Sequence, residues 1–316
     1  MTPLFELKNI QMDFTLPHRR GLGPALSLRA LRGVDLQVGP GEVLGLVGES
    51  GCGKSTLARV AVGLLDPSAG QRLWQGQPFP RDQRRGPALA QMVFQDAGAA
   101  LNPRLTVGDQ IGEGALARGL VARAGRDALV AEWMLRVGLD PALAAHYPHM
   151  LSGGQRTRVV IARALAVQPR FLVCDEGTAA LDLSVQAQVL NLLADLRAEL
   201  GLSYLFISHD LATVRHVSGR VAVMYLGRIV EQAATAELFA NPRHPYTQAL
   251  LAASPGMDGS APAVTLHGDP PSPLDPPAGC AFHPRCAHAF ERCPRARPEL
   301  AEAAPGHLSA CHLGRA

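Results

Sequence analysis

Short apolar runs alternate with segments of helical periodicity along much of this chain. Fully apolar runs of four or five residues, which are typical of buried parallel strands, stand at 43–47, 171–174, 204–207 and 221–225. Residues 185–200 lie between two of these runs and carry apolar side chains at helical spacing. Strands and helices in alternation predict an α/β protein with a mostly parallel sheet and crossover helices.

Two other regions extend this α/β prediction. Near the N-terminus, the apolar runs 4–10 and 34–38 flank a stretch rich in Gly, Pro and Arg at 17–24, which predicts antiparallel strands joined by a long turn. Residues 104–150 lack strand-like runs and are rich in Ala, Leu and Arg. We therefore expect a helical subdomain, at about 97–165, inserted between strands.

Composition and charge exclude several classes of protein. The chain has 316 residues and is 47% hydrophobic, so it can bury a large core and is not disordered as a whole. It has no run of about 18 apolar residues, and its start lacks the basic and apolar regions of a secretory signal, so we expect neither a membrane span nor export. The formal net charge of +3 is too small to favour nucleic-acid binding.

The C-terminal part of the chain differs from the rest in composition. Residues 241–316 hold 13 of the 25 prolines and six of the 11 histidines. Proline-rich sequence of this kind is typical of loops rather than of regular helices and strands. We therefore predict a first domain over 1–240 and a C-terminal extension over 241–316.

A glycine-rich loop follows the apolar run at 43–47. It reads G-E-S-G-C-G-K-S-T, which matches the pattern G-x-x-x-x-G-K-[ST] of phosphate-binding loops. Glycines let backbone N–H groups converge on a phosphate chain, and a helix predicted to begin near Lys54 adds the positive end of its dipole. The Lys54 ammonium reaches the phosphates, and the Ser55 hydroxyl is a candidate Mg²⁺ ligand. The candidate phosphate-binding residues are Gly48, Glu49, Ser50, Gly51, Cys52, Gly53, Lys54, Ser55 and Thr56.

Polar side chains follow three of the predicted strands. Asp175 and Glu176 come after the run at 171–174, and in an open parallel sheet ligands bind beyond the carboxyl ends of the strands. Asp175 is thus a candidate Mg²⁺ ligand and Glu176 a candidate base for an attacking water, with helix-capping acids as the alternative. Gln95 follows the apolar run 92–94, and His209 follows the run 204–207 after one intervening serine. Gln95 would complete the Mg²⁺ shell or touch the attacking water, and His209 would contact the γ-phosphate; purely structural roles stay open for both.

A second candidate anion-binding motif stands about 100 residues after the first. Residues 151–155 read L-S-G-G-Q at the predicted start of a helix. A serine there is a candidate N-cap, and the glycines leave backbone N–H groups open to an anion. Two copies of the fold that share nucleotides would use such a site, and an ordinary N-cap is the alternative. The candidate residues are Ser152, Gly153, Gly154 and Gln155.

These motifs closely resemble those of the nucleotide-binding subunits of ABC transporters, and they occur in that family's order. The matching positions are Phe14, 48–56, Gln95, 151–155, 171–176, 180–182 and His209. The stretches LNPRLTVGDQI, YPHMLSGGQRTRVVIARAL, NPRHPYTQALLAA and GCAFHPRCAHAFERCP resemble the oligopeptide/dipeptide-import branch of the family. The resemblance covers nearly the whole chain.

The resemblance implies a fold and a set of residue roles. The fold would be the P-loop ABC ATPase fold, with a mixed sheet core, an antiparallel β subdomain, an inserted α-helical subdomain and a small Cys-rich C-terminal lobe. Phe14 would stack on adenine, and Asp182 would belong to the D-loop beside the nucleotide. Glu176 would be the catalytic carboxylate, His209 would sense the γ-phosphate, and Ser152 would close on the nucleotide held by a partner subunit.

The resemblance also implies partners and a location. The chain would bind ATP and Mg²⁺ and would energise import of di- or oligopeptides. It would work at the cytoplasmic face of the cell membrane with two permease subunits, a second ABC ATPase (we expect a different chain) and an external substrate-binding protein. The alternatives are a related importer for nickel or another small solute, an exporter, and a soluble ABC ATPase acting on nucleic acid or ribosomes. The single phosphate loop and near-neutral charge disfavour the last of these.

Four cysteines crowd into the last part of the chain, where five, six and 17 residues separate them. Clustered thiols without an export signal indicate a metal site, and these spacings are wider than those of zinc knuckles. Thiolate ligation at irregular spacing suits an iron–sulfur cluster, and the resemblance implies a 4Fe–4S cluster on all four. Zinc, with histidines as substitute ligands, and four free thiols are the alternatives. The candidate ligands are Cys280, Cys286, Cys293 and Cys311.

Overall fold

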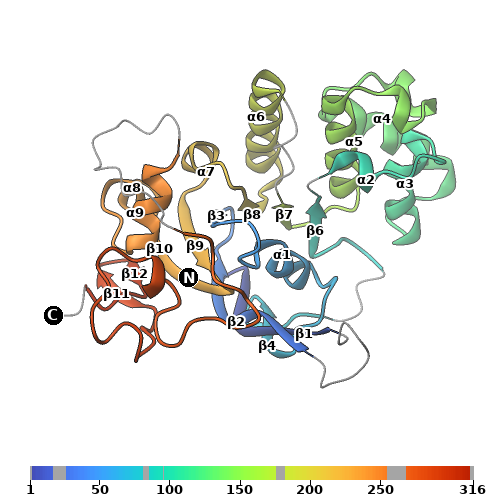
Figure 1. The fold of residues 1–316 in the computed structure, drawn as a ribbon. Helices are drawn as coiled ribbons and strands as arrows, with labels where there is room; N and C mark the ends of the chain where they lie inside the picture. Colours follow the sequence, from blue (N-terminus) through green and yellow to red (C-terminus); the bar gives the residue numbers. More distant parts are fainter. Residues whose placement is uncertain are drawn as a thin grey trace. The chain divides into compact units, whose positions relative to one another are not determined.

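The computed structural model describes residues 2–16, 26–80, 85–94, 96–175, 182–254 and 268–313. The chain divides into two compact units. The first comprises residues 1–38, 43–78 and 206–316, and the second comprises 39–42 and 79–205. In Figure 1 the blue start of the chain and its orange and red end both belong to the first unit. This unit therefore joins the beginning of the chain to its last third.

An antiparallel sheet in the first unit confirms the strands predicted near the N-terminus. Its strands, in the spatial order β2-β1-β4-β5, are β1 (Phe5–Leu16), β2 (Leu26–Val38), β4 (Ala69–Trp74) and β5 (Gln77–Pro78). Phe5 of β1 pairs with Val38 of β2, and Phe14 pairs with Leu28. The apolar positions that predicted these strands are buried, because one face of the sheet packs into the core.

A second sheet in the first unit combines the strand before the phosphate loop with strands from the last third of the chain. β3 (Val43–Val47) pairs in parallel with β9 (Arg220–Tyr225), whereas β9 and β10 (Arg228–Ala234) are antiparallel. β10 pairs antiparallel with β12 (His307–Ser309), and β12 with β11 (Ala301–Ala304). The C-terminal extension thus adds two short strands to the core sheet, which its loop-like composition did not predict.

The helices of the first unit are short. They are α1 (Lys54–Val62), α7 (Leu211–Val217), α8 (Thr235–Ala240) and α9 (Pro245–Ala252), with the 3₁₀ turn η4 (His283–Arg285). α7 packs directly on β3, since a Cβ at Gly45 would lie 2.5 Å from Val214 Cγ1. Any side chain at Gly45 would force the helix away from the strand that precedes the phosphate loop.

The second unit contains parallel strands and a group of helices. β6 (Ala90–Val93) pairs in parallel with β7 (Phe171–Asp175), and β8 (Ser203–Ile207) begins in this unit and ends in the first. The helices are α2 (Ala97–Ala100), α3 (Val107–Ala117), α4 (Arg126–Arg136), α5 (Gly153–Leu165) and α6 (Leu183–Leu200), with 3₁₀ turns η1 (Arg123–Gly125), η2 (Pro141–Ala145) and η3 (Pro148–Met150). Every residue of 97–165 is described, and none of them lies in a strand.

The fully apolar runs are the buried centre of the fold, as predicted. All five residues of β3, β7 and β8 are buried. Strands that are covered on both faces need apolar residues at every position, which explains why these runs do not alternate. Within the described part of the chain, no helix combines the length and the apolar character needed to cross a membrane.

Candidate functional site

The phosphate-binding loop links β3 to α1 in the first unit (Figure 1). Gly48 and Gly53 have φ angles of 153° and 111°, which only glycine adopts readily. A Cβ would lie 2.2 Å from the Met224 carbonyl oxygen at Gly48, and 2.8 Å from the Ala30 carbonyl oxygen at Gly53. Both positions therefore require glycine, because of the backbone conformation and because neighbouring strands approach so closely.

Lys54 and the start of α1 form the cationic side of this loop. α1 begins at Lys54, and no side chain caps its first turn, so the positive end of its dipole faces the loop. The Lys54 side chain is buried, and its Nζ donates to the carbonyl oxygens of Gly48 at 2.7 Å and of Glu49 at 3.0 Å. The ammonium is thus held against the loop.

Glu49 ties the loop to the C-terminal extension. Arg285 of η4 donates from Nη1 and Nη2 to the two Glu49 carboxylate oxygens at 2.7 and 2.8 Å. The Arg285 side chain is only 5% exposed, and this hydrogen-bonded contact raises its pKa further above the usual value. The Glu49 backbone N–H also donates to the Tyr246 hydroxyl at 2.8 Å. Sequence reasoning missed Arg285 and Tyr246, because neither belongs to a recognised phosphate-binding motif.

An aromatic cluster supports this connection. The rings of Tyr225 and Tyr246 are 4.6 Å apart, and Phe282 lies 5.4 and 5.3 Å from them. His244 lies against Phe282, and its Nδ1 accepts a hydrogen bond from the Tyr246 backbone N–H at 3.0 Å. Burial lowers the pKa of His244 to about 4, so the imidazole is neutral in the folded protein. Residues 244–246, Phe282 and the Arg285 side chain therefore pack as one buried group against the phosphate loop.

Two further predicted site residues lie in the first unit. The backbone N–H of Ser208 donates to the Leu46 carbonyl oxygen, so the end of β8 lies beside the end of β3. His209 is the next residue and is exposed, at the carboxyl end of the strands where ligands bind in such sheets. Phe14 is half-buried on β1, opposite Leu28.

Other predicted residues lie in the second unit or outside the described residues. Asp175 is the last residue of β7 and is buried. Asp182 directly precedes α6 and makes no side-chain capping bond. Gln95 and Glu176 fall outside the described residues, so their predicted roles stay predictions.

The L-S-G-G-Q motif forms the start of α5. The Ser152 hydroxyl accepts a hydrogen bond from the Gln155 backbone N–H at 3.3 Å, and Gln155 Oε1 accepts one from the Ser152 backbone N–H at 2.9 Å. This reciprocal pair is a capping box, which fixes the first turn of the helix. A Cβ at Gly154 would lie 2.6 Å from Val185 Cγ1 on α6, so this glycine also allows close helix packing.

The four C-terminal cysteines gather in the first unit. The Cys280 backbone N–H donates to the Cys293 carbonyl oxygen at 2.8 Å. Burial raises the pKa of Cys280 to about 11, and the negative charges of Cys293, Cys311 and Cys286 add to this effect. Burial also raises the pKa values of Cys286 and Cys311.

The fit of these cysteines to a metal is incomplete in this structure. All four are free thiols that lie within electrostatic reach of one another, and soft thiolates are the ligands that iron–sulfur clusters and zinc prefer. Among the described residues, however, no three Cys, His, Asp or Glu side chains stand in position to hold a metal ion. The donor chemistry fits a cluster, whereas the side chains do not stand in a ligand arrangement.

Comparison with known protein families identifies two regions of the chain. The family described as ABC transporter matches residues 31–179, and the family described as the oligopeptide/dipeptide transporter C-terminal region matches 230–293. The oligopeptide transport ATP-binding protein AppF of Bacillus subtilis is 46% identical over 98% of this chain and 97% of its own length. The di/tripeptide transport ATP-binding protein DppF of Pseudomonas aeruginosa is 49% identical over 86% of each chain.

Solved structures of similar fold agree with this result. CbiO1 of Clostridium perfringens, described as part of the ABC transporter complex cbiONQ, superposes with a TM-score of 0.63 at 28% identity, over 76% of this chain and 92% of that chain. The ATP-binding cassette MJ0796, solved as a post-hydrolysis dimer with ADP and Pi, also gives a TM-score of 0.63, at 27% identity, over 73% of this chain and 98% of that chain.

Proposed function

This chain belongs to the ABC transporter ATPases with the oligopeptide/dipeptide transporter C-terminal region, and on that premise we propose how its residues energise import. It is the ATP-binding and ATP-hydrolysing subunit of an importer for di- or oligopeptides. The observation that carries this function is the phosphate loop, with Lys54 held at an uncapped helix start, in a chain whose C-terminal region is that of peptide transporters.

The nucleotide roles that we propose are those that the sequence motifs imply. Lys54 and the N–H groups of residues 48–56 bind the phosphates, and Phe14 stacks on the base. Ser55, Gln95 and Asp175 hold the Mg²⁺ that accompanies ATP. Glu176 accepts the proton of the attacking water, His209 contacts the γ-phosphate, and Asp182 lies beside the nucleotide. Support comes from the positions of Asp175, at the carboxyl end of the buried strand β7, and of His209, two residues after the buried strand β8.

The working unit is a pair of ATPases. We place Ser152, Gly153, Gly154 and Gln155 on the ATP that the partner subunit holds, so that two ATP molecules are shared between two chains. The dimeric state described for MJ0796 with ADP and Pi supports this arrangement. The partner is a second, different ATPase chain, and the pair drives two permease subunits that receive substrate from an external binding protein. The complex lies at the cytoplasmic face of the cell membrane.

Peptide transport is tested by reconstitution. Proteoliposomes that contain this ATPase with its partner ATPase and both permeases, supplied with the binding protein, are expected to take up a labelled tripeptide only when ATP is present. Nickel uptake in the same vesicles is the matched comparison. ATP-dependent uptake of nickel but not of peptide would contradict the peptide assignment and leave the ATPase assignment intact.

We assign a 4Fe–4S cluster to Cys280, Cys286, Cys293 and Cys311. Support comes from the gathering of these thiols in one part of the first unit and from the donor chemistry. A cluster with four thiolates would cross-link an extension that has few regular elements. Protein purified without oxygen is expected to contain iron and acid-labile sulfide and to absorb broadly in the visible range. Zinc without sulfide would show that the four cysteines hold zinc and not an iron–sulfur cluster. The absence of both iron and zinc would refute a metal site at these cysteines.

The division into 1–240 and 241–316 is retained as a functional division. The first segment holds every proposed nucleotide residue, and the second holds every proposed cluster ligand.

A further inference from the structure

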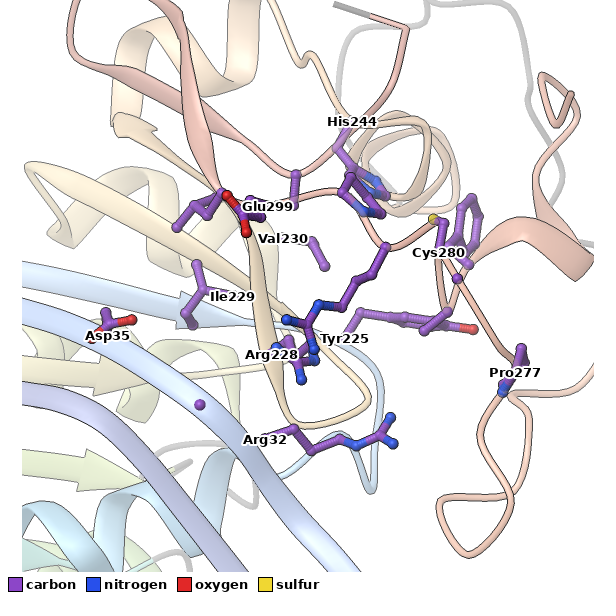
Figure 2. A pocket seen from close by; sticks show the side chains of 18 of the residues that line it. Arg32, Asp35, Tyr225, Arg228, Ile229, Val230, His244, Pro277, Cys280 and Glu299 are labelled. Carbon is purple, nitrogen blue, oxygen red and sulfur yellow. The ribbon is translucent and has the colours of Figure 1, made fainter. Parts of the chain in front are cut away.

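A cavity of about 690 Å³ lies in the first unit, between the antiparallel sheet, the β9–β10 hairpin and the C-terminal extension. No residue of the phosphate loop lines it, and Cys280 is the one candidate metal ligand among its lining residues. Figure 2 shows side chains that line this cavity, among them Arg32, Arg228 and Tyr225. The nucleotide roles proposed above make no use of it.

Four arginines line the cavity, namely Arg29, Arg32, Arg228 and Arg297. Burial lowers the pKa of Arg228 to about 10, and the side chains that lower it further are Arg297, Arg32 and Arg29. Burial likewise lowers the pKa of Arg32, again with help from Arg29 and Arg297. These guanidinium groups therefore repel one another in a partly desolvated space.

The negative groups around the cavity balance this charge only in part. Arg29 Nε donates to Asp13 at 3.1 Å, so one arginine is paired. Asp35 lines the cavity but accepts a hydrogen bond from the Asn9 backbone N–H, and Figure 2 shows it apart from Arg32 and Arg228. Glu299 also lines the cavity and has contacts of its own.

One of the arginines that line the cavity also has an unsatisfied hydrogen-bond donor. Arg32 Nε is buried and has no hydrogen-bond partner among the described residues. A buried donor without a partner is unfavourable, so a ligand that accepts a hydrogen bond from it gains affinity. The arginines that line this cavity repel one another, and one of them has a donor without a hydrogen-bond partner. An anion that accepts hydrogen bonds would compensate for both.

We propose that this cavity binds a phosphorylated small molecule, with its phosphate group on Arg32, Arg228 and Arg297. A phosphate monoester carries up to two negative charges and accepts paired hydrogen bonds from guanidinium forks. The cavity is within the size range of small-molecule sites and far exceeds a bare phosphate ion. Tyr225 and Phe282 line it as well and give the organic part of the molecule an apolar surface.

The site is separate from the ATP site but adjoins the group that holds the phosphate loop. Tyr225 lines the cavity, and the Arg285 guanidinium lies 3.5 Å from its hydroxyl. Arg285 in turn binds Glu49 of the loop. A ligand in the cavity would thus contact Tyr225, which touches Arg285, and Arg285 binds Glu49 of the phosphate loop.

The test measures anion binding with the phosphate loop already occupied. The full-length protein is saturated with a non-hydrolysable ATP analogue and Mg²⁺, and inorganic phosphate is then added against potassium chloride at equal ionic strength. We expect the unfolding midpoint to rise by roughly 3 °C with phosphate and to stay constant with chloride. Failure of the analogue itself to stabilise the protein would concern the ATP site and would be seen before phosphate is added.

Variants locate the effect. The double substitution Arg32→Gln/Arg228→Gln is expected to abolish the phosphate response, and Arg297→Gln, at an exposed position, is expected to weaken it. Arg295→Gln is the matched control, because Arg295 is 73% exposed, pairs with Glu291 and does not line the cavity. An unchanged phosphate response in the Arg297→Gln and double variants, or no response in the wild type, would overturn the proposal.

A vesicle arm separates two sources of the phosphate group. Vesicles of phosphatidic acid in phosphatidylcholine are compared with phosphatidylcholine alone in a sedimentation assay. If the wild type responds to soluble phosphate and the arginine variants do not, the ligand is a soluble phosphorylated molecule. If binding to phosphatidic acid vesicles depends on the same arginines and soluble phosphate has no effect, the soluble molecule is excluded and the phosphate belongs to a lipid headgroup.

Discussion

Single residues outside the phosphate-binding motif hold the loop in place. Glu49 occupies one of the motif's variable positions, yet its carboxylate, backbone N–H and carbonyl oxygen are all bound, by Arg285, Tyr246 and Lys54. Because Lys54 donates to the Glu49 carbonyl, the anchor of Glu49 also fixes where the ammonium rests. Loop geometry therefore depends on side chains about 200 residues further along the chain.

Replacing Arg285 with alanine is expected to weaken ATP binding. The substitution leaves the Glu49 carboxylate without its cation, which should lower the free energy of unfolding by about 3 kcal/mol and raise the ATP dissociation constant roughly tenfold. Arg285→Lys should recover part of the affinity, since it restores charge but not the paired geometry. Equilibrium binding of a fluorescent ATP analogue measures the effect, with the exposed Arg295→Ala as control. Unchanged affinity in Arg285→Ala would show that the pair does not position the loop.

Glu176→Gln separates binding from turnover. Glutamine keeps the shape of the side chain but does not accept a proton at neutral pH, so kcat should fall at least about a hundredfold while ATP binding changes by less than about twofold. The phosphate-release rate and ATP affinity are measured on the same sample. Glu291→Gln, at an exposed position in the C-terminal extension, is the matched control. Near-normal hydrolysis in Glu176→Gln would refute the assignment of this residue as general base.

At the scale of elements, the extension is joined to the core through β10 and α9. Glu231 of β10 is fully buried and accepts hydrogen bonds from the His244 backbone N–H at 3.1 Å and from His307 Nε2 at 2.7 Å. His244 then caps α9 by accepting from the Tyr246 backbone N–H. Two segments of the extension thus converge on one core strand.

This arrangement predicts a loss of stability in acid. The pKa of His244 is lowered to about 4 in the folded protein, from an unfolded value of about 6.5. The unfolded chain therefore binds an extra proton between these values, and stability falls as pH decreases through this window, by up to about 3 kcal/mol. Denaturant unfolding at pH 7.5 and pH 5 measures the loss.

His244→Asn is the matched variant, because asparagine can still cap α9 but does not titrate in this range. Its stability should fall less between pH 7.5 and pH 5 than that of the wild type, and the difference between the two losses is the contribution of His244. Equal losses in both would show that another group carries the acid sensitivity.

The pattern of apolar residues predicted the strands of the core but not the pairing of strands that are far apart in the sequence. Continuous apolar runs located β3, β7 and β8 to within one residue, because strands covered on both faces leave no polar position. The phosphate loop was also predicted correctly from the sequence, because its backbone conformation requires glycine at fixed positions. β11 and β12 were missed because short strands of three or four residues carry little periodicity.

The candidate site was predictable where a motif is local and unpredictable where it depends on tertiary contacts. Lys54 and Ser152 stand where their motifs placed them, at the starts of α1 and α5. Arg285 and the arginine-lined cavity were not predicted, because arginine is the common cation of this chain and nothing local distinguishes one that is buried against Glu49. Burial and pairing of such residues are set by the fold as a whole.

At the scale of the whole molecule, the extension packs with the start of the chain. Residues 206–316 cluster with the N-terminal strands and the phosphate loop in one compact unit. The Ala310 backbone N–H donates to the Val230 carbonyl oxygen, and β12 pairs with β10 beside it. Backbone hydrogen bonds therefore join the extension after residue 240 to the strand that precedes it.

A chain that ends at residue 240 is accordingly expected to lose ATP binding. It lacks Arg285 and Tyr246, which hold Glu49, and it leaves the buried Glu231 carboxylate without the N–H groups and imidazole that it binds. Losses of about 3 kcal/mol at each of these points together approach the entire stability of an ordinary domain. Soluble yield, circular dichroism and ATP-analogue binding are compared with those of a chain that lacks only residues 314–316. If the chain ending at 240 folds and binds the analogue with unchanged affinity, the extension is dispensable for the phosphate loop, and the contacts through Arg285 and Tyr246 only attach it to a core that stands alone.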